Sequence, residues 1–174
     1  LESDDYLYVP AMKEMGHPMR LIQPYVPEQI IPKFCKSGSI VMDIGANVGE
    51  WTLNMAKMVG DTGRVFSIEP NPSMAQALKK TVAINNLSQV SIFQGAMSNQ
   101  TGHLDLTIPY TQDGQALPFG SQMGNEYTPP SKDVAVSWGA MATTKTIKIQ
   151  TTSIDSYVSD KGIPKLDFIK VDVE

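Results

Sequence analysis

The heptapeptide DIGANVG, at residues 43–49, has the glycines and polar side chains of a ligand-binding loop. Gly45 and Gly49 allow a tight turn and let the backbone N–H groups of a following helix face a ligand. A dinucleotide-binding loop reads G-x-G-x-x-G, whereas this loop reads G-x-x-x-G and carries Asn47 where the middle glycine would meet a pyrophosphate. Asp43 would also sit poorly beside a pyrophosphate, but it suits a ligand that bears an amine and a sulfonium. The loop therefore predicts S-adenosylmethionine as the cofactor.

A second carboxylate, Glu69, lies 20 residues after Gly49, at the end of the next expected strand. It can accept hydrogen bonds from both vicinal hydroxyls of a ribose, which fits an adenosyl cofactor or NAD. After a third expected strand come Gln94, Gly95 and Ala96, where a small backbone would permit the close approach of an adenine. These residues support nucleoside binding without choosing between the two cofactors.

The last expected strand ends in Asp172, and Glu174 follows it. Each of the four expected strands thus ends in distinctive polar residues, the others being Asp43, Glu69 and Gln94. The carboxyl ends of parallel strands lie at one edge of a sheet, and open α/β sheets bind ligands outside that edge, where the strand order reverses. The sequence therefore predicts one site that is built from all four strand ends.

Alternating strands and helices are the elements that must position these residues, and this alternation predicts an α/β fold. Strands are expected at residues 40–42, 64–68, 90–94 and 166–172. One helix is indicated by apolar and small side chains at the spacing of a single helix face, Val48, Thr52, Met55 and Val59. A second helix is expected after Asn71 as its cap and Pro72 at its first position, with one face formed by Met74, Leu78 and Val82.

An antiparallel pair of strands is expected further along the chain, because apolar residues recur there at every second position: Leu104, Leu106, Ile108, Ile147 and Ile149. The polar segment between them, residues 109–144, predicts a long loop, which is either a lid or recognition loop or a variable surface insertion. Residues 1–24 are expected to be irregular, and residues 25–174 to form a single cofactor-binding domain.

Composition restricts the classes of partner. The chain has 174 residues and a formal net charge of −4, and it lacks the basic stripe that would track a nucleic acid. No apolar run reaches the roughly 20 residues that a membrane helix needs. We therefore expect a soluble, cytoplasmic protein that acts on small molecules, without nucleic acid or membrane as a partner. The single cysteine, Cys35, is expected to be a packed thiol, and no spacing of residues predicts a metal site.

Four segments of the chain resemble successive signatures of the FkbM-like family of S-adenosylmethionine-dependent methyltransferases. They read VMDIGANVGEWT, VFSIEPNP, NNLSQVSIFQGAMSNQTG and TTSIDSYV…LDFIKVDVE, and the resemblance covers about residues 25 to 174 except for the long loop. It implies a Rossmann-like class I methyltransferase fold, a three-layer αβα sheet that is mostly parallel with an antiparallel pair. It also implies O-methylation of a hydroxyl on a sugar, glycan or natural product.

The resemblance also implies roles for individual residues. The methionine-side loop is formed by Asp43, Gly45, Ala46, Asn47 and Gly49. Glu69, followed by Pro70 and Asn71, holds the ribose; Gln94 and Gly95 approach the adenine; and Asp172 lines the methyl-donor pocket. Relatives often carry asparagine at the position of Gly95, and the family continues beyond DVE into further helices and strands. We therefore expect that the C-terminal part is missing, or that a partner or second copy completes the fold and forms a homo-oligomer through the terminal strand.

Two questions stay open at the level of sequence. Asp172 or Glu174 could take the proton from the acceptor hydroxyl or orient it, but both could instead only bind the cationic end of the cofactor or a structural amide. The alternatives to a methyltransferase are an NAD-dependent oxidoreductase or epimerase, and a non-catalytic module that keeps the fold and the cofactor without turnover.

Overall fold

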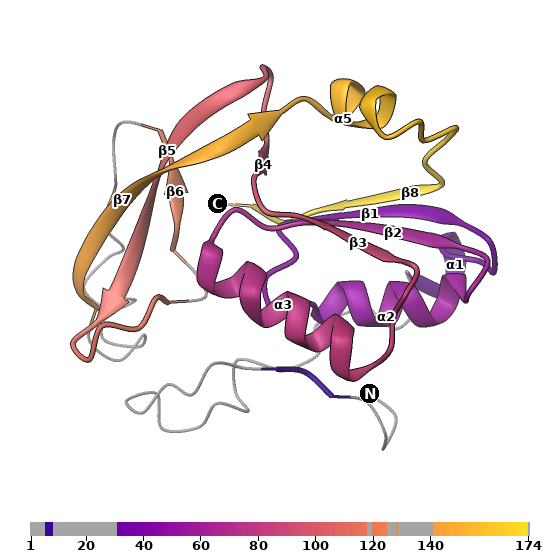
Figure 1. Cartoon of the computed structure of the whole chain (residues 1–174), viewed down its shortest axis with the longest axis horizontal. Helices are drawn as coiled ribbons and strands as arrows, with labels where there is room; N and C mark the ends of the chain where they lie inside the picture. The colour runs from indigo at the N-terminus through magenta and orange to yellow at the C-terminus, as the bar shows by residue number, and fades with distance from the viewer. Residues whose placement is uncertain (1–5, 9–30, 118–119, 125–127, 129–140, 174) are drawn as a thin grey trace.

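A computed structural model describes residues 6–8, 31–117, 120–124, 128 and 141–173, which form two sheets and their covering helices (Figure 1). The main sheet has four parallel strands in the order β3-β2-β1-β8. These strands are β1 (Ile40–Ile44), β2 (Arg64–Ile68), β3 (Val90–Phe93) and β8 (Phe168–Val171). Because the strand order reverses beside β1, the carboxyl end of this strand is where an open α/β sheet binds a ligand.

Helices cover both faces of the main sheet and give the expected three-layer αβα arrangement (Figure 1). One face carries α1 (Ile31–Phe34), α2 (Glu50–Val59) and α3 (Pro72–Ile84), and the other carries α5 (Ile154–Asp160). Successive side chains of β1 pack against the helices on opposite faces of the sheet, because strand side chains alternate between faces. Val41 belongs to a core cluster with Leu53 of α2, whereas Met42 belongs to another with Tyr157 of α5. None of the helices among the described residues is both long and apolar enough to cross a membrane.

The strands and helices of the structure lie close to the ranges that were predicted from the local sequence. The strand expected at 64–68 coincides with β2, and the other three expected strands differ from β1, β3 and β8 only at their ends. Asn71 caps α3 as expected, since its Oδ1 accepts a hydrogen bond of 3.0 Å from the N–H of Ser73. On α2 the buried face includes Thr52, Met55 and Val59, as their spacing predicts. Val48 lies before the first residue of this helix.

The expected antiparallel pair exists, but it belongs to a second sheet and not to the main one. This sheet has the strand order β4-β7-β5-β6. Its strands are β4 (Ala96–Met97), β5 (Gly102–Thr111), β6 (Gln122–Met123) and β7 (Met141–Thr152). The alternating apolar residues meet across the pair, with Leu104 opposite Ile149 and Leu106 opposite Ile147.

The connection between these two long strands is shorter than the loop expected at 109–144, because β5 continues to Thr111 and β7 begins at Met141. Threonines favour extended backbone in both strands, and the hydroxyls of Thr107 and Thr146 lie 2.9 Å apart across the pair. Much of the remaining connection lies outside the described residues. Its role as a lid or as a surface insertion stays a prediction, as does the division of the chain at residue 25.

The free side of β8 is an open strand edge within the described part of the chain, where β8 pairs only with β1. Ile169 and Val171 on this strand are 37% and 59% exposed. An edge of this kind can pair with another chain. A homo-oligomer formed through it stays a prediction.

Gly45 brings the loop after β1 into close contact with the end of β8. Its φ of 76° lies in the left-handed region, and a Cβ atom on this residue would stand 2.0 Å from the carbonyl oxygen of Asp172. The two strand ends are also joined by a hydrogen bond of 3.1 Å from the N–H of Asp172 to the carbonyl of Ile44. Glycine is therefore required here both by the backbone conformation and by the lack of space.

A buried ion pair joins the same two strands two residues before Gly45 and Asp172. Asp43 of β1 and Lys170 of β8 are register partners, 0% and 8% exposed, with Nζ 3.0 Å from Oδ1. The contact lacks the alignment of a hydrogen bond, but Lys170 Nζ also donates to the carbonyl of Gly45 at 2.8 Å. The second oxygen of Asp43 accepts a hydrogen bond of 2.6 Å from the hydroxyl of Thr52 on α2. One pair of charges thus connects β1, β8, the glycine loop and α2.

We expect Gly45→Ala to lower the free energy of unfolding by about 2 kcal/mol more than Gly114→Ala, because a Cβ at Gly45 overpacks the backbone of Asp172. Gly114 is the matched control: its φ is 81°, and nothing lies within 4 Å of the Cβ position. Both variants thus carry the same backbone strain, and only one carries the clash. Urea unfolding measures the difference, and equal losses in the two variants would contradict the close contact between the loop and β8.

We expect Lys170→Met to lower the free energy of unfolding by about 3–5 kcal/mol, because it leaves the Asp43 carboxylate buried without a counter-charge. Adding Asp43→Asn to this variant removes the uncompensated charge, so the double variant should be more stable than Lys170→Met alone. Urea unfolding of the wild type, the two single variants and the double variant measures the interaction energy between the two side chains. A double variant that loses the sum of the two single losses would show that the two side chains act independently.

Candidate functional site

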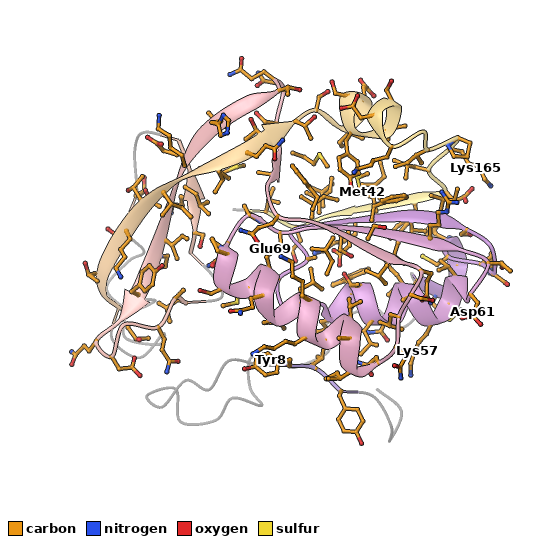
Figure 2. The ribbon with its side chains drawn as sticks, viewed as in Figure 1. Tyr8, Met42, Lys57, Asp61, Glu69 and Lys165 are labelled. Atoms are coloured by element: carbon orange, nitrogen blue, oxygen red, sulfur yellow. The ribbon has the colours of Figure 1, made fainter. Side chains whose placement is uncertain are left out.

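A cavity of about 600 Å³ lies at the carboxyl edge of the main sheet, between the strand ends and the second sheet. Figure 2 labels Glu69 at this edge, on the side of the main sheet that faces the second sheet. Residues after β1, β2 and β8 form one part of the wall, and residues of β4, β5 and β6 form another. The convergence of strand ends that the sequence predicts is therefore present for three of the four strands.

Seven of the residues predicted to bind the cofactor line this cavity: Gly45, Ala46, Asn47, Glu69, Pro70, Asn71 and Asp172. Asp43 does not, because it is fully buried beneath the loop, where it pairs with Lys170. Gly49 also lies outside the lining. A Cβ on it would stand 2.7 Å from Leu78 Cδ1, so glycine at this position lets the start of α2 lie close to α3, and its role in cofactor binding stays a prediction.

Gln94 and Gly95, which were expected near an adenine, also lie outside the cavity lining. The Gln94 side chain is exposed and its Oε1 accepts a hydrogen bond of 3.3 Å from Lys79 Nζ. Gly95 is packed inside the protein, since a Cβ there would stand 2.6 Å from the Phe93 ring and 2.7 Å from the carbonyl of Gln150. The chain turns at Gly95 into β4, so the cavity wall that follows β3 is formed by Ala96, Met97 and Ser98.

Of the two carboxylates predicted to act on an acceptor, only Asp172 can be placed. Its side chain is 79% exposed, it lines the cavity, and its Oδ2 lies 3.9 Å from Lys170 Nζ. Glu174 lies outside the described residues.

Glu69 is a buried acid of the cavity wall that backbone groups hold in place. It is 6% exposed, and its two carboxylate oxygens accept hydrogen bonds of 2.8 Å from the backbone N–H groups of Asn47 and Asn71. Burial raises its pKa from 4.5 to about 7, and these two N–H groups oppose the shift. Each carboxylate oxygen has a second lone pair, so the group can accept two further hydrogen bonds from a ligand. Asn47 supplies its N–H from a left-handed conformation, with φ 51°, which asparagine tolerates.

Several lining residues were missed by the sequence interpretation, among them Glu50 and Trp51 at the start of α2, Lys170 on β8, and Leu106 and Met123 of the second sheet. The position of Lys170 could have been predicted from the sequence, because a lysine in an otherwise apolar strand needs a charged or polar partner when it is buried. The position of Leu106 could not have been predicted, because its sequence context is that of any apolar residue in an alternating strand. It reaches the cavity only because of the path of the second sheet.

The charges on the cavity wall favour a cationic ligand. Among the described lining residues there are three acids, Glu50, Glu69 and Asp172, and one base, Lys170, whose charge is matched by Asp43. A pyrophosphate would bring two further negative charges next to these acids. A sulfonium and an ammonium would offset the negative charges of these acids. The charges of the cavity wall therefore fit S-adenosylmethionine better than NAD.

Burial raises the pKa of the Cys35 thiol to about 11, with the nearby Lys36 opposing the shift. Cys35 is 0% exposed and belongs to the core cluster beneath α2. A thiol with this pKa stays protonated at neutral pH, which is the behaviour of a packed side chain and not of a nucleophile.

The chain is similar to several curated methyltransferases. The 2-O-methyltransferase NoeI of Sinorhizobium fredii is 24% identical over 149 residues, covering 86% of this chain and 58% of that protein. Methyltransferase sdnD of Sordaria araneosa is 26% identical, covering 79% and 57%. Ribosomal RNA large subunit methyltransferase E of Lawsonia intracellularis is 37% identical over 92 residues, covering 52% and 40%. The chain thus spans about half the length of the curated relatives it matches.

Among solved structures, a putative rRNA-methylase from Clostridium thermocellum superposes with a TM-score of 0.37 and 22% identity, over 51% of this chain and 43% of that one. The sequence model described as "Methyltransferase FkbM domain" matches residues 43–174, which begin at the first residue of the glycine loop and include every residue of the cavity wall. Because this match covers most of the chain, the protein belongs to the FkbM methyltransferase domain family.

Proposed function

We propose that this protein transfers a methyl group from S-adenosylmethionine to a hydroxyl group of a sugar, glycan or natural product. The observation that carries the proposal is the buried carboxylate of Glu69, held by two backbone N–H groups in a cavity whose other acids match a cationic cofactor. Membership of the family supports methyl transfer. The relative named a 2-O-methyltransferase supports a hydroxyl as the acceptor.

In this proposal the ribose hydroxyls donate to Glu69, and the loop from Gly45 to Asn47 lies against the sulfur-bearing part of the cofactor. The adenine would meet Ala96 and Met97, whose small and apolar side chains follow β3 in place of Gln94 and Gly95. When bound, the cofactor supplies an electrophilic methyl group on its sulfonium. The protein's own contribution is to hold donor and acceptor in line and to exclude water, and alignment of this kind can supply effective molarities of about 10⁵–10⁸ M.

The acceptor hydroxyl must lose its proton as it attacks. We propose that the Asp172 carboxylate takes this proton or orients the hydroxyl, because it lines the cavity and its side chain is exposed. Glu174 remains the second candidate for this role. If both residues only bind the cofactor, removing the Asp172 carboxylate will weaken cofactor binding instead of the chemical step.

The proposed cofactor is tested by calorimetric titration with S-adenosylhomocysteine and with NAD. We expect micromolar binding of S-adenosylhomocysteine and no measurable heat with NAD, because the three wall acids disfavour the pyrophosphate. The same protein should then transfer labelled methyl groups to sugars or polyhydroxylated natural products. Asp172→Asn should lose transfer while it still binds S-adenosylhomocysteine.

Three results would reject parts of this proposal. Binding of NAD without S-adenosylhomocysteine would favour the oxidoreductase alternative. Binding of S-adenosylhomocysteine without transfer to any acceptor would favour a non-catalytic module. Unchanged transfer by Asp172→Asn would remove this residue as the base.

Cofactor affinity should depend on pH through Glu69. The ribose hydroxyls bind the ionised carboxylate more tightly than the neutral acid, and the pKa of Glu69 in the folded protein is raised to about 7. The ionised form is therefore dominant above this pH and is lost as the pH falls through it. We expect the dissociation constant for S-adenosylhomocysteine to rise about tenfold between pH 8 and pH 6.

Glu69→Gln is the matched variant for this measurement, because it keeps the shape of the side chain and cannot titrate. Its affinity should be weaker than that of the wild type at pH 8 and nearly constant down to pH 6. Asp61→Asn removes a charge from an exposed turn and should keep the wild-type profile. A wild-type profile that is flat, or that Glu69→Gln preserves, would show that Glu69 does not contact the ligand.

A further inference from the structure

Glu50, the first residue of α2, presents a buried carboxylate oxygen that lacks a partner. Its side chain lines the cavity, and within the described part of the chain Oε1 receives no hydrogen bond although solvent does not reach it. Burial raises the pKa of this group, and the charge of Lys170 opposes the shift. A buried acceptor left without a donor is unfavourable for the free protein. The arrangement is therefore that of a group whose partner arrives with a ligand.

Glu50 and Glu69, the carboxylate proposed to bind the ribose, line the same cavity from different elements. Glu69 follows β2, whereas Glu50 begins α2, the helix that follows β1, and the charge of Lys170 on β8 acts on both carboxylates. Lys170 Nζ also lies 5.9 Å from the ring centre of Trp51, the residue next to Glu50. Because both carboxylates line one cavity, a nucleoside with its ribose on Glu69 could reach Glu50 with its 5′ substituent.

Among the described residues, the cation that acts on Glu50 is Lys170, which already has other partners. Lys170 Nζ is 3.0 Å from Asp43 Oδ1 and donates to the carbonyl of Gly45 at 2.8 Å. The carboxylate of Asp172 lies 3.9 Å from the same Nζ. This corner of the cavity thus carries more negative than positive charge, and it suits the positively charged part of a ligand.

We propose that Glu50 binds the α-ammonium group of the methionine part of the cofactor and thereby selects cofactors that carry an intact amino acid. The inference rests on the proposed function and deepens it, since it concerns one end of the same ligand. Glu50 accepts two N–H bonds from a cation at the β1–β8 corner, while Glu69 accepts O–H bonds at the β2 end. The two carboxylates together fix the length and direction of the bound cofactor.

The experiment compares two ligands that differ only in the amino acid part, S-adenosylhomocysteine and 5′-methylthioadenosine, by calorimetric titration of the protein. We expect Glu50→Gln to weaken binding of S-adenosylhomocysteine about tenfold or more, and to change binding of 5′-methylthioadenosine by less than about twofold. Asp155→Asn is the matched control, because Asp155 is also an acid in the first turn of a helix but is exposed on α5. It should leave both affinities unchanged.

A second ligand keeps the proposal testable if Glu50→Gln fails to fold. The analogue of S-adenosylhomocysteine without its α-amino group should bind the wild-type protein about tenfold more weakly than S-adenosylhomocysteine does. In a folded Glu50→Gln variant, the two should bind almost equally. Equal binding of both ligands to the wild type, or an equal loss of S-adenosylhomocysteine and 5′-methylthioadenosine in Glu50→Gln, would overturn the assignment.

These outcomes separate the inference from the function on which it rests. If the wild-type protein binds neither S-adenosylhomocysteine nor 5′-methylthioadenosine, the proposed cofactor itself is wrong. If it binds both and Glu50→Gln binds S-adenosylhomocysteine as tightly as the wild type, the cofactor stands and the role of Glu50 is rejected.

Discussion

The buried ion pair between Asp43 and Lys170 is the constraint on which the site depends. The two residues are register partners on adjacent parallel strands, and neither charge is accessible to solvent to any useful extent. A buried pair of this kind contributes little net stability, because the cost of desolvation offsets most of the attraction. Its effect is on geometry: the ammonium also holds the carbonyl of Gly45, and the carboxylate holds the hydroxyl of Thr52 on α2.

This pairing also decides the charge that the cavity presents. Lys170 lines the cavity, but its charge is paired with that of the buried Asp43, so it offsets the three acids of the wall only in part. Burial then raises the pKa of Glu50 and of Glu69. A cation in the cavity would lower the cost of ionising these acids, so selectivity for a positively charged cofactor follows from how the strands are held together.

The sequence predicted the features that depend on local periodicity and capping, whereas features set by contacts between distant segments could not be predicted from it. The strand at β2 and the cap at Asn71 follow from residues within a few positions of one another. The location of Gly95 could not be found in this way, because it is set by contact with Gln150, which is remote in sequence. Asp43 was expected in the loop that faces the ligand, but its register partner on β8 draws it into the interior.

Asn71 shows how the two halves of the cavity are held in position relative to each other. Its backbone N–H donates to Glu69, its Oδ1 caps α3, and its Nδ2 reaches the carbonyl of Leu117 at 3.3 Å and the hydroxyl of Ser121 at 3.4 Å. Leu117 and Ser121 lie between β5 and β6 in the chain, and Ser121 lines the cavity. The residue that helps to orient the proposed ribose ligand therefore also fixes the covering segment. The residues from Glu69 to Asn71 thus influence both the proposed binding of the methyl donor and the shape of the space left for a methyl acceptor. A substitution in this segment should therefore disturb both.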